Sequence, residues 1–142
     1  MGENMKLLID ANIVLDVLQK REPHYRASAC IWKLCEIERA EGWVSALSLA
    51  NLVYVMRREL TPERTAEVVK RLGLIFRFGD LCGADMLRAA ALQWSDFEDA
   101  LQEVLAERLR ADCIITRNGQ DFRKGKLAVY SPTEFLAEYG LS

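Results

Sequence analysis

Short apolar runs that alternate with longer amphipathic stretches constrain the fold of this chain most strongly. The runs have the length of strands and cover residues 5–9, 43–46, 74–78, 113–116 and 127–130. Between them, apolar side chains recur at helical spacings in residues 27–35, 49–56, 65–72, 86–92 and 100–109. Such spacings are typical of helices that pack one face against a core. Strands alternating with helices predict an α/β fold whose mainly parallel sheet is covered on both faces.

Three helix starts can be located from capping patterns. Thr61-Pro62 is typical of an N-cap followed by proline in the first helical position. "SPTE" at 131–134 adds a capping box, and "SDFE" at 95–98 is a second one, which predicts a helix beginning at Asp96. No linker or repeat divides the chain, so we predict a single domain over residues 5–140. Residues 1–4 are interpreted as an N-terminal extension or a cloning remnant.

Composition excludes several classes of protein. The 142 residues are 51% hydrophobic and 28% charged, as in globular and not disordered proteins. No apolar stretch approaches the roughly 20 residues that span a bilayer, and the start of the chain does not resemble a signal peptide. We therefore expect a cytoplasmic protein with no membrane partner. The net charge of −2 means that nucleic-acid binding would need a local basic patch.

The cysteines and the single histidine do not form a zinc motif. Cys30, Cys35, Cys82 and Cys113 contain no CxxC pair, and His24 has no metal-ligand spacing to them. We expect four reduced thiols in the core. Patterns for a dinucleotide site, a P-loop and a serine hydrolase elbow are absent from the sequence, and His24 has no evident Ser or Cys partner.

Polar residues follow the predicted strands at the ends where open parallel sheets bind their ligands. Asp10 and Asn12 follow the first strand, and Asn51 lies in the helix after the second. The fourth run ends at Thr116 and leads to Arg117, Asn118 and Asp121. The helix before that run opens with Asp96 and Asp99, three residues apart and so on one face, and Glu103 extends the same stripe.

Each acid alone has a structural explanation. Asp96 suits a helix N-terminus and Asp121 suits a turn, whereas Asp10 after a buried strand is harder to explain. Together, the acids would repel, by about 4 kcal/mol per pair at ~4 Å and an effective dielectric of ~20. A hard divalent cation turns this repulsion into coordination, and oxygen ligands favour Mg²⁺ or Mn²⁺. The hypothesis is hydrolysis of a nucleic-acid phosphodiester.

Four segments in order, "LLIDANIVLD", "VSALSLANLVYVMRREL", "DFEDALQ" and "DCIITRNGQDF", resemble a PIN domain, the metal-dependent ribonuclease fold of VapC-type toxins. The resemblance covers residues 5–139. It implies a Rossmann-like α/β/α sandwich with a five-stranded parallel sheet, and an acidic pocket that binds Mg²⁺ or Mn²⁺ and cleaves RNA. It also implies a homodimer and a small inhibitory antitoxin as partner.

By position, the resemblance assigns the family acids to Asp10, Asp99 and Asp121, which we predict as catalytic metal ligands. Asp96 is an additional catalytic acid, predicted to hold or orient a water. Two positions depart from the family pattern, because Asn51 and Asn118 are neutral where relatives carry acids. Each exchange removes a negative charge and should weaken Mg²⁺ binding.

The remaining predicted roles concern positioning and RNA contact. Asn12, Asn51, Thr116 and Asn118 are predicted to position ligands or a substrate phosphate. Arg117, Arg123, Lys124 and Lys126 are predicted to contact the RNA backbone, although each also suits a solvated loop. The alternative function is a catalytically weak or inactive PIN-fold module for RNA or protein binding. An aspartyl phosphatase is disfavoured, since it usually needs an acid at the position of Asn12. The number of metal ions stays open.

Overall fold

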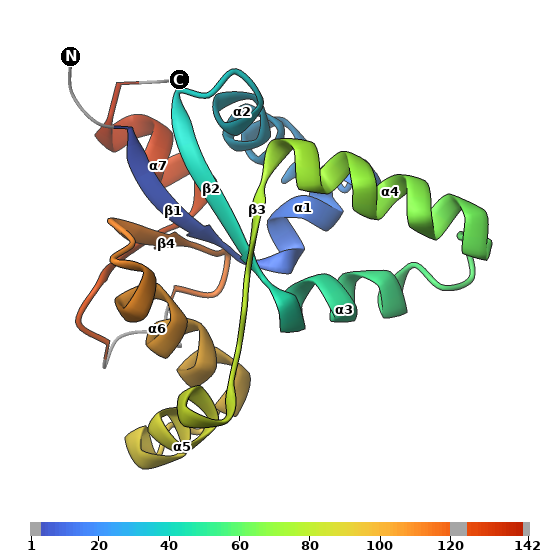
Figure 1. The fold of residues 1–142 in the computed structure, drawn as a ribbon. Coiled ribbons are helices and arrows are strands. Elements are labelled where there is room, and N and C mark those ends of the chain that lie inside the picture. Colours follow the sequence, from blue (N-terminus) through green and yellow to red (C-terminus); the bar gives the residue numbers. More distant parts are fainter. Residues whose placement is uncertain (1–3, 120–124, 141–142) are drawn as a thin grey trace.

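The computed structural model describes residues 4–119 and 125–140. Within these residues the strands are β1 (Met5–Ile9), β2 (Ala40–Ser45), β3 (Arg77–Gly79), β4 (Cys113–Ile115) and β5 (Ala128–Tyr130). The helices are α1 (Ala11–Leu18), α2 (Tyr25–Glu36), α3 (Ala46–Val55), α4 (Pro62–Ile75), α5 (Gly83–Leu92), α6 (Phe97–Leu109) and α7 (Pro132–Glu138). Figure 1 shows the α3–α4 pair extending away from the sheet on one side.

All of the strand pairs are parallel, as predicted. The described strands form a five-stranded sheet in the order β3-β2-β1-β4-β5. β1 is the central strand, and the strand order reverses between β1 and its neighbour β4. Leu8 lies opposite Trp43 on β2 and Ile114 on β4. This confirms the predicted α/β fold class and places the topological switch point at the carboxyl ends of β1 and β4.

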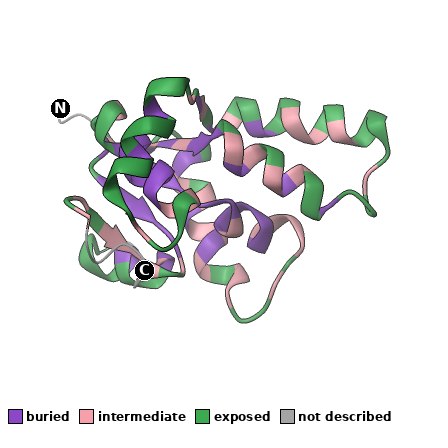
Figure 2. Cartoon of the chain, turned by 90° about the horizontal axis from the view of Figure 1, so that it is seen from below, coloured by how far each residue is buried: buried purple, intermediate pink, exposed green. Residues whose placement is uncertain are grey.

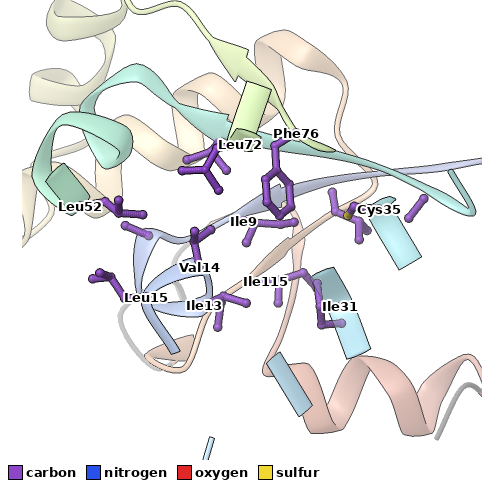
Figure 3. Close-up of a cluster of buried hydrophobic side chains, with 14 of the residues drawn as sticks. Ile9, Ile13, Val14, Leu15, Ile31, Cys35, Leu52, Leu72, Phe76 and Ile115 are labelled. Carbon is purple, nitrogen blue, oxygen red and sulfur yellow. The ribbon is translucent and has the colours of Figure 1, made fainter. Parts of the chain in front are cut away.

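The core is divided by the sheet because successive side chains of a strand point to opposite faces. Leu7 and Ile9 belong to the larger cluster, with α1, α2, α3, α4 and α7, which Figure 3 shows in part. Leu8 and Ile114 belong to the smaller cluster on the other face, covered by α6. Buried residues therefore concentrate on and around the sheet (Figure 2).

Local capping patterns were predicted well at two helices and less well at a third. Thr61 Oγ1 accepts from Arg64 N at 3.2 Å, with Pro62 in the first helical position. Ser131 and Glu134 form the predicted capping box of α7. At α6, however, Asp96 itself is the N-cap and the helix begins at Phe97. Asp96 Oδ1 accepts from Asp99 N at 3.0 Å, one residue later than the predicted box.

Two further predictions were wrong, one about a strand and one about the burial of the cysteines. The run 74–78 was expected as a strand, but Leu74 and Ile75 end α4, and β3 starts at Arg77. Leu74 is 86% exposed, which a strand of this sheet would not allow. The four thiols are not all in the core either: Cys35 and Cys113 are buried, whereas Cys82 is exposed.

Candidate functional site

Asp10 stands at the switch point of the sheet. It is the N-cap residue of α1, directly after β1, and its backbone N donates to the Ile115 carbonyl of β4 at 3.0 Å. Its side chain is only 8% exposed. Thr116, the residue after β4, donates from Oγ1 to Asp10 Oδ2 at 2.8 Å. The ends of the two central strands thus bring together two of the predicted site residues that are 106 positions apart in the chain.

Burial raises the pKa of Asp10 above its ordinary value. The Thr116 hydroxyl, the backbone N–H groups of Asn12 and Ala11 and the charge of Arg117 act in the opposite direction and lower it, without cancelling the effect of burial. A positive charge placed next to this buried carboxylate would stabilise its ionised form. Asn12, predicted to position ligands, is half-buried in the first turn of α1.

The segment after β4 is fixed by its own polar contacts. Thr116 Oγ1 also accepts from Asn118 N at 3.1 Å, so that one hydroxyl connects Asp10 to this turn. Arg117 points instead to α1, where its Nη2 donates to Asp16 Oδ1 at 3.1 Å. Asp16 is fully buried and also accepts from Ser28 Oγ of α2 at 2.9 Å. The Arg117 charge is therefore paired inside the fold.

A residue absent from the predicted site, Glu98, lies at the same edge. Glu98 is half-buried in the first turn of α6, and its Oε2 accepts from Asn51 Nδ2 of α3 at 3.3 Å. Burial and the negative charges of Asp10 and Asp96 raise the pKa of Glu98, while the Asn51 amide lowers it. One signal in the sequence could have indicated this residue. Glu98 is an acid directly before Asp99, in a chain whose position 51 is Asn and not the acid of the family pattern.

The other acids of α6 have different surroundings. Asp96 is exposed and caps the helix, as its structural explanation requires, although its charge still acts on Glu98. Asp99 is half-buried in the first turn of the helix. Glu103 does not extend the stripe into the site, because its Oε2 accepts from Lys126 N at 3.0 Å beside β5. Lys126 itself is exposed and lies two residues before that strand.

Three predicted residues, Asp121, Arg123 and Lys124, lie outside the described residues. Within residues 4–119 and 125–140, no three acids, histidines or cysteines lie close enough together to hold a metal ion. The groups that lie at this edge are the carboxylates of Asp10 and Glu98, whose negative charges act on each other, and the Asn51 amide, which donates to Glu98. This donor chemistry fits part of the shell of a hard divalent cation, which keeps several water ligands.

Comparison with known proteins connects this geometry to a family. The sequence model of the PIN domain matches residues 6–120. A toxin–antitoxin complex from Klebsiella pneumoniae aligns with a TM-score of 0.68 and 21% identity, over 89% of this chain and 97% of that chain. FitAcB from Neisseria gonorrhoeae aligns with a TM-score of 0.68 and 17% identity, over 89% and 98%.

A third similar structure is Mycobacterium tuberculosis VapC20, described as a sarcin–ricin loop cleaving toxin. It has a TM-score of 0.66 and 12% identity, over 85% of this chain and 96% of that chain. No curated protein matches the sequence significantly. At these identities the solved structures show a shared fold, while the family match covers most of the chain. The chain therefore belongs to the PIN domain family.

Proposed function

We propose that this protein is an endoribonuclease that depends on Mg²⁺ or Mn²⁺. The observation that carries the proposal is the enclosed carboxylate of Asp10 at the switch point, held by Thr116 and close to the charge of Glu98. The two carboxylates lie at the edge where open α/β sheets bind ligands. Because burial and mutual repulsion oppose their ionisation, a divalent cation beside them would stabilise their negative charges. Membership of the PIN family and the similarity to an RNA-cleaving toxin support the same reaction.

Each residue of the site has a proposed task. Asp10 and Asp99, with Asp121 from the segment after β4, hold the cation directly or through water. When bound, the cation supplies positive charge for the phosphodiester and lowers the pKa of water. Thr116 fixes the Asp10 carboxylate, and Asn12 and Asn118 orient the substrate phosphate. Asp96 orients the attacking water, in addition to capping α6.

RNA contact is proposed for basic residues near the β4–β5 connection. The exposed Lys126 and, beyond the described residues, Arg123 and Lys124 carry this proposal. Arg117 is paired with Asp16, so its part is to brace the turn and to add positive charge beside Asp10. Contacts of this kind bind phosphates without reading sequence.

A protein partner is proposed from the groove beside α4. The groove has a volume of about 800 Å³, and its lining combines polar and charged side chains with the apolar Leu18, Trp32, Met56, Leu60, Leu72 and Ile75. A groove of this type accepts the apolar face of an amphipathic helix. Similar folds occur in toxin–antitoxin complexes, so we propose a small antitoxin as its occupant and a homodimer as the assembly of the toxin.

A non-catalytic RNA-binding or protein-interaction module is the second candidate. It is favoured by one observation, the neutral side chains of Asn51 and Asn118 at positions where relatives carry acids. Loss of two negative charges would weaken cation binding and could leave a fold that binds RNA without cutting it.

RNA cleavage in the presence of Mn²⁺ and of Mg²⁺ separates the two candidates. We expect cation-dependent cleavage by the wild type, lost by about 100-fold or more in Asp10→Asn and Asp99→Asn, as for removal of a group that stabilises developing charge. The measurement is the rate of product formation on single-stranded and structured RNA, with EDTA as the blank.

Asp112→Asn is the matched control for these variants. Asp112 lies just before β4, at the opposite end of the strand, and an amide oxygen can still accept from Lys6 N as the carboxylate does at 2.7 Å. This variant should cleave at the wild-type rate. RNA that is bound but not cut with either cation would establish the second candidate.

A further inference from the structure

One face of α3 runs from the sheet, past the candidate site, to an exposed surface. Leu47, in the first turn, packs against the cluster that α5 and α6 share. Asn51, four residues further on, donates from Nδ2 to Glu98 Oε2 at the start of α6, at 3.3 Å. Because residues three and four apart share a helix face, Tyr54 and Val55 continue this face outward. Both are exposed, so α6 no longer covers the face at this point.

The Tyr54 ring carries an arginine on one side. Arg57 Cζ lies 4.0 Å from the ring centroid, and its Nη1 donates to the Tyr54 carbonyl at 2.9 Å, which holds the guanidinium in place. Tyr54 is 63% exposed, so the other side of the ring is open to solvent. Within residues 4–119 and 125–140, no ion pair involves Arg57, so its charge is available to an anion. An aromatic ring beside a guanidinium offers a nucleotide a surface for its base and a charge for its phosphate.

This surface is separate from the groove beside α4. From this part of the chain the groove is lined by Met56, Glu59 and Leu60, and not by Tyr54. It is, however, close to the candidate site along α3, because the three residues from Asn51 to Tyr54 rise by only about 4.5 Å along the helix axis. A nucleotide next to one that is held at the candidate site could therefore reach the ring.

We propose that an unpaired base of bound RNA stacks on the open side of Tyr54, while Arg57 supports the ring from the other side and contacts a phosphate. The proposal rests on RNA as the substrate of the proposed function and adds the class of RNA, a strand with at least one nucleotide outside a duplex. Bases inside a duplex stack on each other and present no free face to a side chain. Every base has a π-face, so Tyr54 would select unpaired RNA without reading its sequence.

RNA binding in EDTA tests the proposal without any cation-dependent cleavage. Fluorescence anisotropy would give the Kd of the full chain for a labelled oligonucleotide of about ten nucleotides, both single-stranded and annealed to its complement. Tyr54→Phe keeps the ring and should bind the single strand like the wild type. Tyr54→Leu keeps an apolar side chain without an aromatic face, and it should weaken single-strand binding about 5- to 100-fold, the loss expected for one stacked base. Duplex binding should not change in either variant.

Two controls locate the effect on this surface. Tyr139 is also exposed, but it lines a hollow with Met5 and Ala40, the first residues of β1 and β2, and so lies at the opposite edge of the sheet. Tyr139→Leu should bind both forms of RNA like the wild type. Arg57→Gln should weaken single-strand binding more than Arg58→Gln, which removes the neighbouring exposed charge. Circular dichroism melting confirms that each variant is folded.

The outcomes separate stacking from other roles and from catalysis. Equal weakening in Tyr54→Phe and Tyr54→Leu, an equal loss for single strand and duplex, or no loss in Tyr54→Leu overturns the proposal. Unchanged RNA binding with an altered oligomeric state of Tyr54→Leu in light scattering also overturns it and assigns the surface to a protein contact.

The cleavage assay with Mn²⁺ and Mg²⁺ decides the proposed function independently. RNA that is bound through Tyr54 but cut with neither cation supports the stacking site and overturns the nuclease. A wild type that cleaves RNA while Tyr54→Leu binds it normally overturns the stacking site and leaves the nuclease intact.

Discussion

At the scale of single residues, the acids of α6 differ in purpose although they lie within two turns. Asp96 caps the helix, Glu98 accepts from Asn51, and Glu103 accepts from Lys126. Their spacing predicted one acidic stripe on a single helix. They do share α6, with Asp96 as its N-cap, but Glu103 contacts Lys126 and does not continue the stripe toward the site. A local pattern cannot show which long-range donor each carboxylate meets. The contact of Glu98 with Asn51 was therefore not predicted, whereas the position of Asp10 at the end of β1 was.

Glu103 should make stability depend on pH. It is 2% exposed, and burial raises its pKa, while the Lys126 backbone N–H lowers it and the Glu107 carboxyl raises it further. The ionised form is thus disfavoured in the folded state. Protonated Glu103 therefore stabilises the folded state. The stabilisation is fully present below the ordinary glutamate pKa of 4.5 and is lost as pH rises through the raised pKa of the folded state.

Glu103→Gln removes the titration and keeps an oxygen that can accept from Lys126 N. We expect this variant to be more stable than the wild type at pH 8, with a difference that shrinks as pH falls and closes below about 4.5. Urea denaturation across this pH range gives the two free energies of unfolding. A difference that does not change with pH would contradict the assignment.

At the scale of elements, the order and type of most helices and strands could be predicted from apolar spacing. The failures have physical reasons. A short apolar run such as 74–78 does not distinguish the last turn of a helix from a strand. The helix α1 was not predicted, because Ile13, Val14 and Leu15 form a short continuous apolar run, which does not by itself distinguish a helix from a strand. β2 begins at Ala40, earlier than expected, since its first half contains Glu41 and Gly42.

Gly42 is required by the packing of β2. A Cβ there would lie 2.6 Å from Cys35 Sγ, 2.9 Å from Phe76 Cδ1 and 3.1 Å from Ile9 Cδ1. We expect Gly42→Ala to lower the free energy of unfolding by about 1–3 kcal/mol through overpacking. Denaturant unfolding measures the change.

Gly83→Ala is its control, because a Cβ at Gly83 meets no atom within 4 Å. This second variant should differ from wild type by less than about 1 kcal/mol. Equal stability of both variants would mean that the core around β2 adapts to an added methyl group.

At the scale of the whole molecule, the fold was predictable because many weak signals agreed, whereas the site was predictable only in part. The family match and the parallel sheet support the expected α/β architecture. The placement of polar residues at strand ends follows from the parallel topology. The contact between α3 and α6 could not be predicted, because it depends on how two helices far apart in the sequence pack at one edge of the sheet.

In residues 4–119 and 125–140, every helix is too short or too polar to span a bilayer.

The buried thiols should report how the molecule opens as a unit. Burial raises the pKa of Cys35 and of Cys113 to about 12, and at Cys113 the Asp112 charge adds to the effect. We expect both to react with a thiol reagent at pH 8 only through global unfolding, while the exposed Cys82 reacts at once. Mass spectrometry of each labelled cysteine gives the rates.

Cys82→Ser should remove the labelling of the exposed thiol and leave the rates of Cys35 and Cys113 unchanged, with the half-buried Cys30 followed as a separate site. Because Cys35 comes from α2 and Cys113 from β4, equal protection would show one cooperative unit. Much faster labelling of Cys113 than of Cys35 would instead reveal separate opening of the β4 side of the sheet.

The projecting α3–α4 pair offers a place for a reporter group. Its connecting turn carries the exposed Arg58, which lies beyond the end of α3 and directly precedes Glu59, one of the residues that line the groove. A fluorescent dye on Arg58→Cys, in the Cys82→Ser background, would sense a helix that enters the groove while sparing the carboxylates. Screening could then follow the proposed docking and the proposed RNA cleavage as separate optical and chemical signals on one sample.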